Sequence, residues 1–259
     1  MPAEPPVLLF GAQRSGTTAL ATVLHGAFRA AGGIFTINGK LPYLLHRWCT
    51  QADVDGRHLR ADEILHALDR KPPYLPPDGW RERVETVVRA AAARVAEGAV
   101  TDAAELRRQI IAAGYAGATR WGEKYNEYLL ELDALAAGAP GARWVLLIRH
   151  PAAVAESTLR WGGDRPWRPG RREGVLRKWV AWHEGWLRHP RSGDCLVLEY
   201  DRLCRGPDLR RLAQVIGLDL APYARDLVAR PGPPDGVPDD VERVWQALLD
   251  RRAAGNGRR

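Results

Sequence analysis

The chain has 259 residues, of which 46% are hydrophobic, and its formal net charge at neutral pH is +7. This length fits one α/β domain with insertions, and the apolar content is ample for a core. The positive charge favours anionic partners, but the arginines are spread along the chain, and no basic block indicates a nucleic-acid-binding arm. A continuous apolar run of about 18 residues is also missing from the sequence, which excludes a typical membrane-spanning helix.

The cysteine content predicts a reducing environment. Cys49, Cys195 and Cys204 have no CxxC spacing, and an odd number leaves one of them unpaired. They form neither a disulfide framework nor a zinc-ligand pattern. The N-terminus, MPAEPPVLLF, lacks the basic start and the length of apolar run of a signal peptide. We therefore expect a cytoplasmic protein.

The first elements alternate between strand and helix. Residues 7–10 form a short, continuous apolar run, typical of a buried parallel strand, and residues 17–31 predict a helix. Residues 34–37 are a plausible second strand. From about 40 to 118 the sequence is mostly helical, with a proline-rich break at 71–79, and it predicts a helical insertion.

The second half of the chain continues the alternation. Its predicted strands lie at 120–124, 144–148 and 195–200, and its predicted helices at 127–137, 151–161, 175–187, 208–216 and 239–251. Apolar strands that alternate with helices predict a mainly parallel sheet with helices on both faces. We expect a single α/β domain over residues 1–259, whose ligand binds at the carboxyl ends of the strands.

The segment GAQRSGTT, residues 11–18, lies between the first strand and the first helix, which is the position of a phosphate-binding loop. Gly11 and Gly16 permit a tight turn whose backbone N–H groups face an anion. The other candidate ligand-binding residues of the loop are Gln13, Arg14, Ser15, Thr17 and Thr18. Thr17 stands where nucleoside triphosphate enzymes have a lysine, and Arg14 is the only cation in the loop. The fold expected is thus of the P-loop type.

A second candidate anion site follows the strand at 144–148. Arg149 lies at the carboxyl end of this strand, Pro151 begins a helix, and Ser157 lies within that helix. Taken alone, this pattern is weak evidence, because it is more typical of a solvated arginine and an ordinary helix serine than of an anion site. Because two carboxyl ends of one parallel sheet can meet at the same edge, the pattern gains weight from the loop at 11–18.

Together these motifs resemble those of sulfotransferases that use 3′-phosphoadenosine 5′-phosphosulfate (PAPS). In that family a K/R-S-G-T-T loop binds the 5′-phosphosulfate, and residues 14–18 match it; an R-x-P-x-x-x-x-x-S segment binds the 3′-phosphate, and Arg149, Pro151 and Ser157 match it. The arginine form of the loop resembles tyrosylprotein and many bacterial sulfotransferases. The segment 196–220 is also similar to the family, and that similarity implies a place for Tyr200 near the adenine.

The resemblance implies an enzyme that passes the sulfuryl group of PAPS to a hydroxyl of a small-molecule or glycoside acceptor, with PAP as product and no metal. It covers residues 7–31 and 119–220 well, and the rest of the chain poorly. The C-terminus lacks the segment with which cytosolic animal members close over the 3′-phosphate. The sequence indicates no particular oligomeric state.

The segment WGEKYNEY, residues 121–128, resembles a W-G-E-K-T-P segment of bacterial sulfotransferases, which implies that Lys124 is a catalytic cation alongside Arg14. A base must also take the proton of the acceptor, and no residue matches the bases of the family. Glu123 is the first candidate because it is next to Lys124. The other candidates are Glu127, Asp53, His46 and His183.

Ten tryptophans are present, and several follow the second motif. Trp179, Trp182 and Trp186 share one helix face, which is typical of core packing. Trp161 and Trp167 flank a basic loop and can stack on an aromatic or sugar acceptor. The arginines of that loop, either solvated or facing an anionic acceptor, are Arg165, Arg168, Arg171 and Arg172.

Two other functions remain open on the sequence alone. A P-loop small-molecule kinase would carry a lysine at the position of Thr17 and would need magnesium. A non-catalytic nucleotide-binding module would bind PAP without turnover, and the unassigned base is the one feature that favours it.

Overall fold

The computed structural model describes residues 4–70, 72–162, 168–229 and 236–254. Five strands form one sheet in the order β2-β3-β1-β4-β5, and all neighbouring pairs are parallel. The strands are β1 (Val7–Phe10), β2 (Ile34–Ile37), β3 (Trp121–Lys124), β4 (Arg143–Ile148) and β5 (Leu196–Glu199). The predicted α/β fold with a parallel sheet is therefore confirmed.

Helices cover both faces of the sheet because strand side chains alternate between the faces. Val7 and Leu9 pack with α1 (Thr17–Ala30), α10 (Tyr200–Cys204) and α11 (Pro207–Ile216). Leu8 and Phe10 belong to the core on the opposite face. The helices of that face are η1 (Asn126–Leu130), α7 (Leu132–Gly138), α8 (Pro151–Leu159), α9 (Arg172–Arg188) and α12 (Asp239–Ala254).

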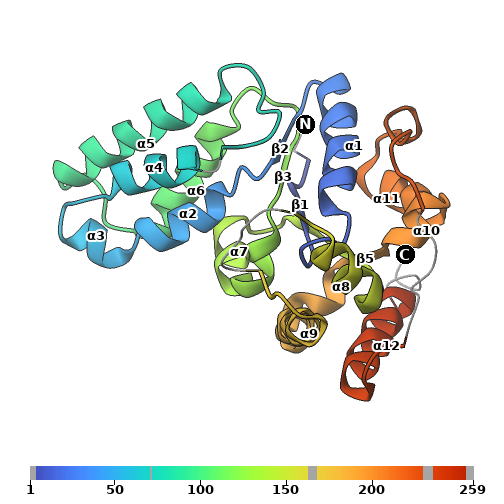
Figure 1. The fold of residues 1–259 in the computed structure, drawn as a ribbon. Coiled ribbons are helices and arrows are strands. Elements are labelled where there is room, and N and C mark those ends of the chain that lie inside the picture. The colour runs from blue at the N-terminus through green and yellow to red at the C-terminus, as the bar shows by residue number, and fades with distance from the viewer. Residues whose placement is uncertain (1–3, 71, 163–167, 230–235, 255–259) are drawn as a thin grey trace.

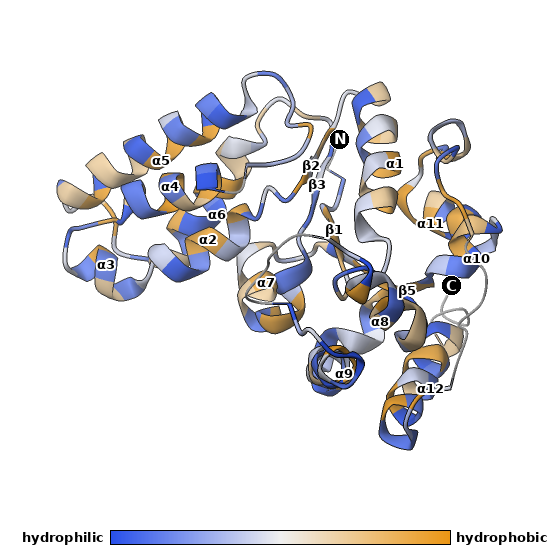
Figure 2. Ribbon diagram, in the orientation of Figure 1, coloured by the Kyte–Doolittle hydropathy of each residue, from blue (hydrophilic) through white to orange (hydrophobic). Residues whose placement is uncertain are grey.

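The predicted helical insertion has its own hydrophobic core. Its helices are α2 (Leu41–Trp48), α3 (Gln51–Asp55), α4 (Ala61–Arg70), α5 (Trp80–Ala96) and α6 (Ala103–Gly114). Figure 1 shows them as a separate group beside β2 and β3. Each is amphipathic, as the alternating blue and orange of Figure 2 shows, and Trp80, Ile64 and Leu106 are among the side chains buried between them.

The proline-rich break at 71–79 has a structural role that the sequence did not reveal. Tyr74 pairs in antiparallel fashion with Ile37, and its backbone N–H donates a hydrogen bond of 2.8 Å to the Ile37 carbonyl. Because β2 is an edge strand, this contact covers part of an otherwise unpaired edge.

Two element boundaries differ from the prediction. The helix expected over 127–137 is divided into η1 and α7, because Glu131 between them has a non-helical backbone (φ −133°, ψ 47°). Tyr200, expected at the end of a strand, instead begins α10. This change turns its side chain toward the loop at 11–18, as described below.

The three cysteines are free; Cys49 and Cys195 are buried, and Cys204 is partly buried. None of the helices in the described ranges has both the length and the apolar character needed to cross a bilayer.

Candidate functional site

The loop at 11–18 leaves β1 and enters α1 through backbone conformations that constrain its sequence. Gly16 has φ of 91°, in the left-handed region, and a Cβ there would collide with the ring of Tyr200. A Cβ at Gly11 would collide with the carbonyl oxygen of Leu147 in β4. Glycine is therefore required at both positions for a reason that the structure makes explicit.

The start of α1 offers donors rather than acceptors. Its N-cap, Gly16, has no side chain to cap the helix, and its first turn contains no acidic residue. The Ser15 hydroxyl is completely buried, and within the described residues it has no hydrogen-bond partner. Since helix N-termini attract negative charge, this turn has the composition and polarity of an anion site.

The two predicted anion motifs meet. Arg14 donates a hydrogen bond of 3.1 Å from Nε to Ser157 Oγ, although 143 residues separate them. Arg149 donates one of 3.4 Å from Nη1 to the backbone oxygen of Arg14. This convergence follows from the sheet, because β1 and β4 are neighbouring parallel strands and both end at this edge.

Aromatic rings hold the two arginines in place. The Arg14 guanidinium lies 4.8 Å from the centre of the Trp161 ring, and that of Arg149 lies 4.9 Å from the centre of the Tyr200 ring. Tyr200 also packs against Gly16 and donates a hydrogen bond of 3.3 Å to the carbonyl of Val228. Tyr200 therefore lies between the two anion motifs, and its predicted place near an adenine stays a prediction.

Lys124 reaches the same loop from β3. Its Nζ donates to Asn38 Oδ1 at 3.2 Å and to Thr18 Oγ1 at 3.5 Å, and the residue is only 4% exposed. Three neighbouring strands, β3, β1 and β4, thus bring Lys124, Arg14 and Arg149 to one edge.

Asn126 is a site residue whose contribution the sequence did not indicate. Its amide donates to the carbonyl of Gly11 at 2.6 Å and to the hydroxyl of Thr17 at 3.2 Å. Both contacts lie in the loop at 11–18. The available signal was an amide two residues after Lys124, at a position where the resemblance leads one to expect proline.

Glu123 points away from the loop. Its carboxylate is fully buried and accepts hydrogen bonds from Tyr115 at 2.9 Å, from Thr36 at 3.3 Å, and from Tyr128. Burial raises the pKa of this carboxyl above its ordinary value. Because successive strand residues face opposite sides, placing Lys124 at the loop places Glu123 on the far side.

Three of the remaining candidate bases lie away from the loop at 11–18, either in structural contacts or on the surface of the insertion. His183 is fully buried in α9, where it contacts the Trp179 carbonyl and burial lowers its pKa to about 4. Asp53 caps α3 through Thr50 and forms an ion pair with Arg60 at 3.0 Å. His46 is exposed on α2 in the insertion.

Glu127 is the candidate that is related to the loop, through the side chain of Lys178. It is half-buried in η1, and it hydrogen-bonds the Tyr125 hydroxyl, whose pKa is raised by burial and further by this carboxylate. The negative charge of Glu127 also acts on Lys178, where it opposes the lowering of the lysine pKa by burial. Lys178 in turn donates a hydrogen bond of 3.3 Å to Gln13 Oε1, which connects Glu127 to the loop.

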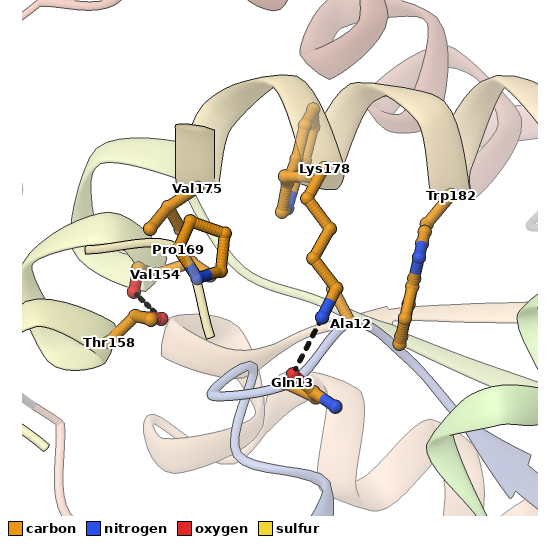
Figure 3. Close-up of a pocket in the computed structure, with 9 residues that line it drawn as sticks. Ala12, Gln13, Val154, Thr158, Pro169, Val175, Lys178 and Trp182 are labelled. Atoms are coloured by element: carbon orange, nitrogen blue, oxygen red, sulfur yellow. Dashed lines mark hydrogen bonds between the residues drawn. The ribbon is translucent and has the colours of Figure 1, made fainter. Parts of the chain in front are cut away.

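A pocket lies between this lysine, the loop and α8. Figure 3 shows the Lys178 side chain extending from α9 to Gln13, with Trp182 on one side and Val154, Pro169 and Val175 on the other. The Lys178 ammonium lies 5.0 Å from the centre of the Trp182 ring. The wall beside Gln13 is thus mainly apolar with one cation.

The tryptophans that follow the second motif have different surroundings. Trp179, Trp182 and Trp186 are buried in the core formed by α9 and α12, which confirms their predicted packing. Trp161 contacts Arg14. Arg172 donates a hydrogen bond of 2.9 Å to the carbonyl of Gly236. Two predicted residues of the basic loop, Arg165 and Trp167, lie outside the described residues.

Solved structures with a similar fold are known. The chain is similar in fold to the sulfotransferase domain from the Synechococcus PCC 7002 olefin synthase, with 20% identity, a TM-score of 0.56, and coverage of 95% of this chain and 96% of that one. It is also similar to the sulfotransferase domain from the curacin biosynthetic pathway, with 14% identity, a TM-score of 0.52, and coverage of 95% and 98%. A comparison with curated protein sequences found no significant match.

These structures establish the likeness of fold, and the family follows from the sequence itself. The model of a family described as "Sulfotransferase family" matches residues 5–222. This match spans the whole sheet, the loop at 11–18 and both arginine motifs. The chain therefore belongs to the sulfotransferase family.

Proposed function

We propose that this chain is a PAPS-dependent sulfotransferase that forms a sulfate ester on a hydroxyl of a small-molecule or glycoside acceptor, with PAP as the second product. The observation that carries the proposal is the meeting of Arg14 with Ser157 at 3.1 Å and with Arg149 at 3.4 Å. Two anion-binding motifs at adjacent strand ends suit a ligand with two separate anionic groups.

The residues present fit the donor. Gln13, Ser15, Thr17 and Thr18, with the backbone of Gly11 and Gly16, would hold the 5′-phosphosulfate, and Arg149 with Ser157 would hold the 3′-phosphate. Two donor atoms support this assignment: Ser15 Oγ and Arg149 Nε are buried, and neither has a partner in the described part of the chain. Buried donors without partners are costly, and a bound anion would satisfy them.

The loop also lacks what a nucleoside triphosphate requires. The hydroxyl of Thr17, at the usual lysine position, accepts a hydrogen bond from Asn126 and leaves no cation there. Since PAPS carries a single 5′-phosphate joined to sulfate, a lysine for outer phosphates is unnecessary.

PAPS supplies a sulfuryl group whose departure leaves negative charge on the bridging oxygen. Arg14 and Lys124 would stabilise that charge, because fixed cations in a site that excludes water interact strongly with developing charge. Lys124 is suited to this role by its burial and by its position against Thr18.

We assign the general base to Glu127, which is half-buried, close to Lys178 and within one residue of Asn126. Its carboxylate would take the proton of the acceptor hydroxyl. Glu123 was the first candidate from the sequence; in view of its three hydroxyl partners we propose that it positions the end of β3, and therefore Lys124.

The proposal is tested by calorimetric titration with PAP and by transfer of labelled sulfate from PAPS to a panel of hydroxyl acceptors. We expect PAP to bind with one site and labelled sulfate esters to form without added magnesium. Failure of a folded protein to bind PAP overturns the proposal. Binding of PAP with no transfer to any acceptor would favour a non-catalytic nucleotide-binding module instead.

A further inference from the structure

A second pocket opens in the helical insertion, between α2 and α4. Six of the residues that line it are Lys40, Tyr43, Arg47, Trp48, Arg70 and Tyr125. Its volume of about 350 Å³ suits a small ligand or part of one. None of the roles proposed above uses this pocket.

The pocket adjoins the catalytic lysine along two segments of the chain. Tyr125, which lines the pocket, directly follows Lys124. On the other side, Asn38 accepts the hydrogen bond from Lys124 at 3.2 Å, and Lys40 lies only two residues beyond it. The rings of Tyr125 and Tyr43 contact each other with centroids 5.1 Å apart and join the two segments. The wall of this pocket is therefore continuous along the chain with the residues around Lys124.

Three cations, Lys40, Arg47 and Arg70, line the pocket, together with one carboxylate, Glu63. Arg47 and Arg70 are exposed, and within the described residues neither forms an ion pair with a carboxylate, whereas Arg60, Arg81 and Arg89 of the same insertion each do. Arg47 instead donates a hydrogen bond of 2.8 Å to the Tyr43 hydroxyl.

Two acids that do not line the pocket act on residues that do: Glu131 interacts electrostatically with Arg47, and Glu127 hydrogen-bonds Tyr125. Asp69, which also interacts with Lys40, makes two hydrogen bonds of 2.6 Å to Arg81 outside the pocket. Lys40 is held toward the pocket wall by a hydrogen bond of 2.7 Å to the carbonyl of Ala67.

Aromatic rings accompany the cations. The Arg47 guanidinium lies 5.6 Å from the ring centres of both Tyr43 and Trp48. This stacking restricts the arginine, so that less side-chain freedom is lost when it binds an anion. The flat ring faces also offer contact to an apolar or aromatic part of the same ligand.

We infer that the pocket between α2 and α4 binds a phosphate or carboxylate group of the acceptor through Arg47 and Arg70, so that the substrate is a hydroxyl compound that also carries an oxyanion. This inference rests on the proposed function, because it concerns the molecule that receives the sulfate. A planar guanidinium matches either oxyanion in a two-point contact. The pocket thus determines which hydroxyl compounds are placed beside Lys124.

The test is calorimetric titration of three small probes into protein that has been saturated with PAP, which keeps the probes out of the donor site. Phenyl phosphate and benzoate present the two oxyanions, and benzyl alcohol has a similar ring without charge. The variants are Arg47→Ala and Arg70→Ala. Arg94→Ala is the matched control, because Arg94 is an exposed arginine of the same insertion that contacts Gln109 at 3.2 Å.

We expect at least one of the two anions to bind the wild type and benzyl alcohol not to bind. Loss of a charged hydrogen bond costs about 1.5–3 kcal/mol, so each pocket variant is expected to weaken anion binding roughly 10- to 100-fold. The control is expected to bind within about 2-fold of the wild type, since it removes a distant, screened charge. Whether phenyl phosphate or benzoate binds more tightly identifies the oxyanion of the acceptor.

Absence of anion binding to the PAP complex overturns the inference and leaves the donor site standing. Equal weakening in Arg94→Ala and the pocket variants also overturns it, because it would show a general charge effect. A protein that does not bind PAP, but binds phenyl phosphate through Arg47 and Arg70, overturns the proposed function and retains the anion pocket.

Discussion

The proposed donor loop at 11–18 and the proposed anion pocket of the helical insertion present their polar groups in different ways. In the loop, the backbone conformation fixes the position of the polar groups: Gly16 has positive φ, and neither it nor Gly11 has room for a Cβ. In the insertion, the polar groups are at the ends of long side chains, because Arg47 and Arg70 line an open pocket from two helices. The first arrangement suits one invariant ligand, and the second can change its specificity through single substitutions without altering the fold. The predictions below test this division.

The largest effect is expected for Glu127→Gln, which keeps the size of the side chain and removes its basicity. If Glu127 takes the proton of the acceptor, kcat falls about 10²- to 10⁴-fold. Glu123→Gln is the comparison, with an expected loss of less than about 10-fold, because its carboxylate is buried among hydroxyls and away from the loop. Initial rates with labelled PAPS measure both; the reverse order would assign the base to Glu123.

Lys124→Ala is expected to lower kcat about 10²- to 10³-fold, which is typical of removing one group that stabilises charge in the transition state. Binding of PAP should change little by calorimetry, because the loop and Arg149 remain. Lys178→Ala serves as the comparison: Lys178 contacts Gln13 at 3.3 Å and has no proposed role in the transition state, so its loss should affect KM more than kcat. A large rise in the Kd of PAP for Lys124→Ala would instead make Lys124 a binding residue.

Arg149→Ala tests the donor half alone. We expect the Kd of PAP to rise roughly 10- to 100-fold, because a charged contact to the 3′-phosphate is lost. Adenosine 5′-monophosphate, which lacks that phosphate, should bind the variant and the wild type about equally. If both nucleotides lose the same affinity, Arg149 supports the loop through its contact with the Arg14 backbone rather than binding the 3′-phosphate.

The same division explains which features were predictable from the sequence. The strands at 7–10 and 34–37, and the turn at 11–18 that leads into the first helix, were correctly predicted, because they depend on local apolar runs and on glycine. The meeting of Arg14 and Ser157 depends on β1 and β4 being neighbours, which the motifs suggested only through the family resemblance. Because side chains alternate along a strand, the sequence implied that Glu123 and Lys124 face opposite sides of β3. Only the structure showed that Lys124 is the one on the side of the loop at 11–18.

The residues proposed to act on the acceptor, Glu127 and those of the anion pocket, were harder to predict from the sequence. Glu127 was placed inside a continuous helix, whereas the chain breaks at Glu131 and so holds η1 against the loop. The anion pocket brings together side chains of α2, α4 and the segment after β3, and no local pattern in the sequence relates them.

Asn126 joins the two halves, and its replacement gives the smallest of the expected effects. It follows the acceptor-side Tyr125, yet its amide donates to Gly11 at 2.6 Å and to Thr17 at 3.2 Å. Asn126→Ala leaves these buried acceptors without their donor, so we expect a loss of about 1–3 kcal/mol in the free energy of unfolding. Because the loop loses its support from η1, PAP binding should weaken by roughly 3- to 10-fold. Urea unfolding and calorimetry measure the two effects.

Gln109→Ala, which removes an exposed amide on α6, is the control, with an expected change within about 0.5 kcal/mol. Unchanged PAP binding in a destabilised Asn126→Ala protein would show that the loop holds its shape without help from the acceptor side, and that the two halves of the site are independent.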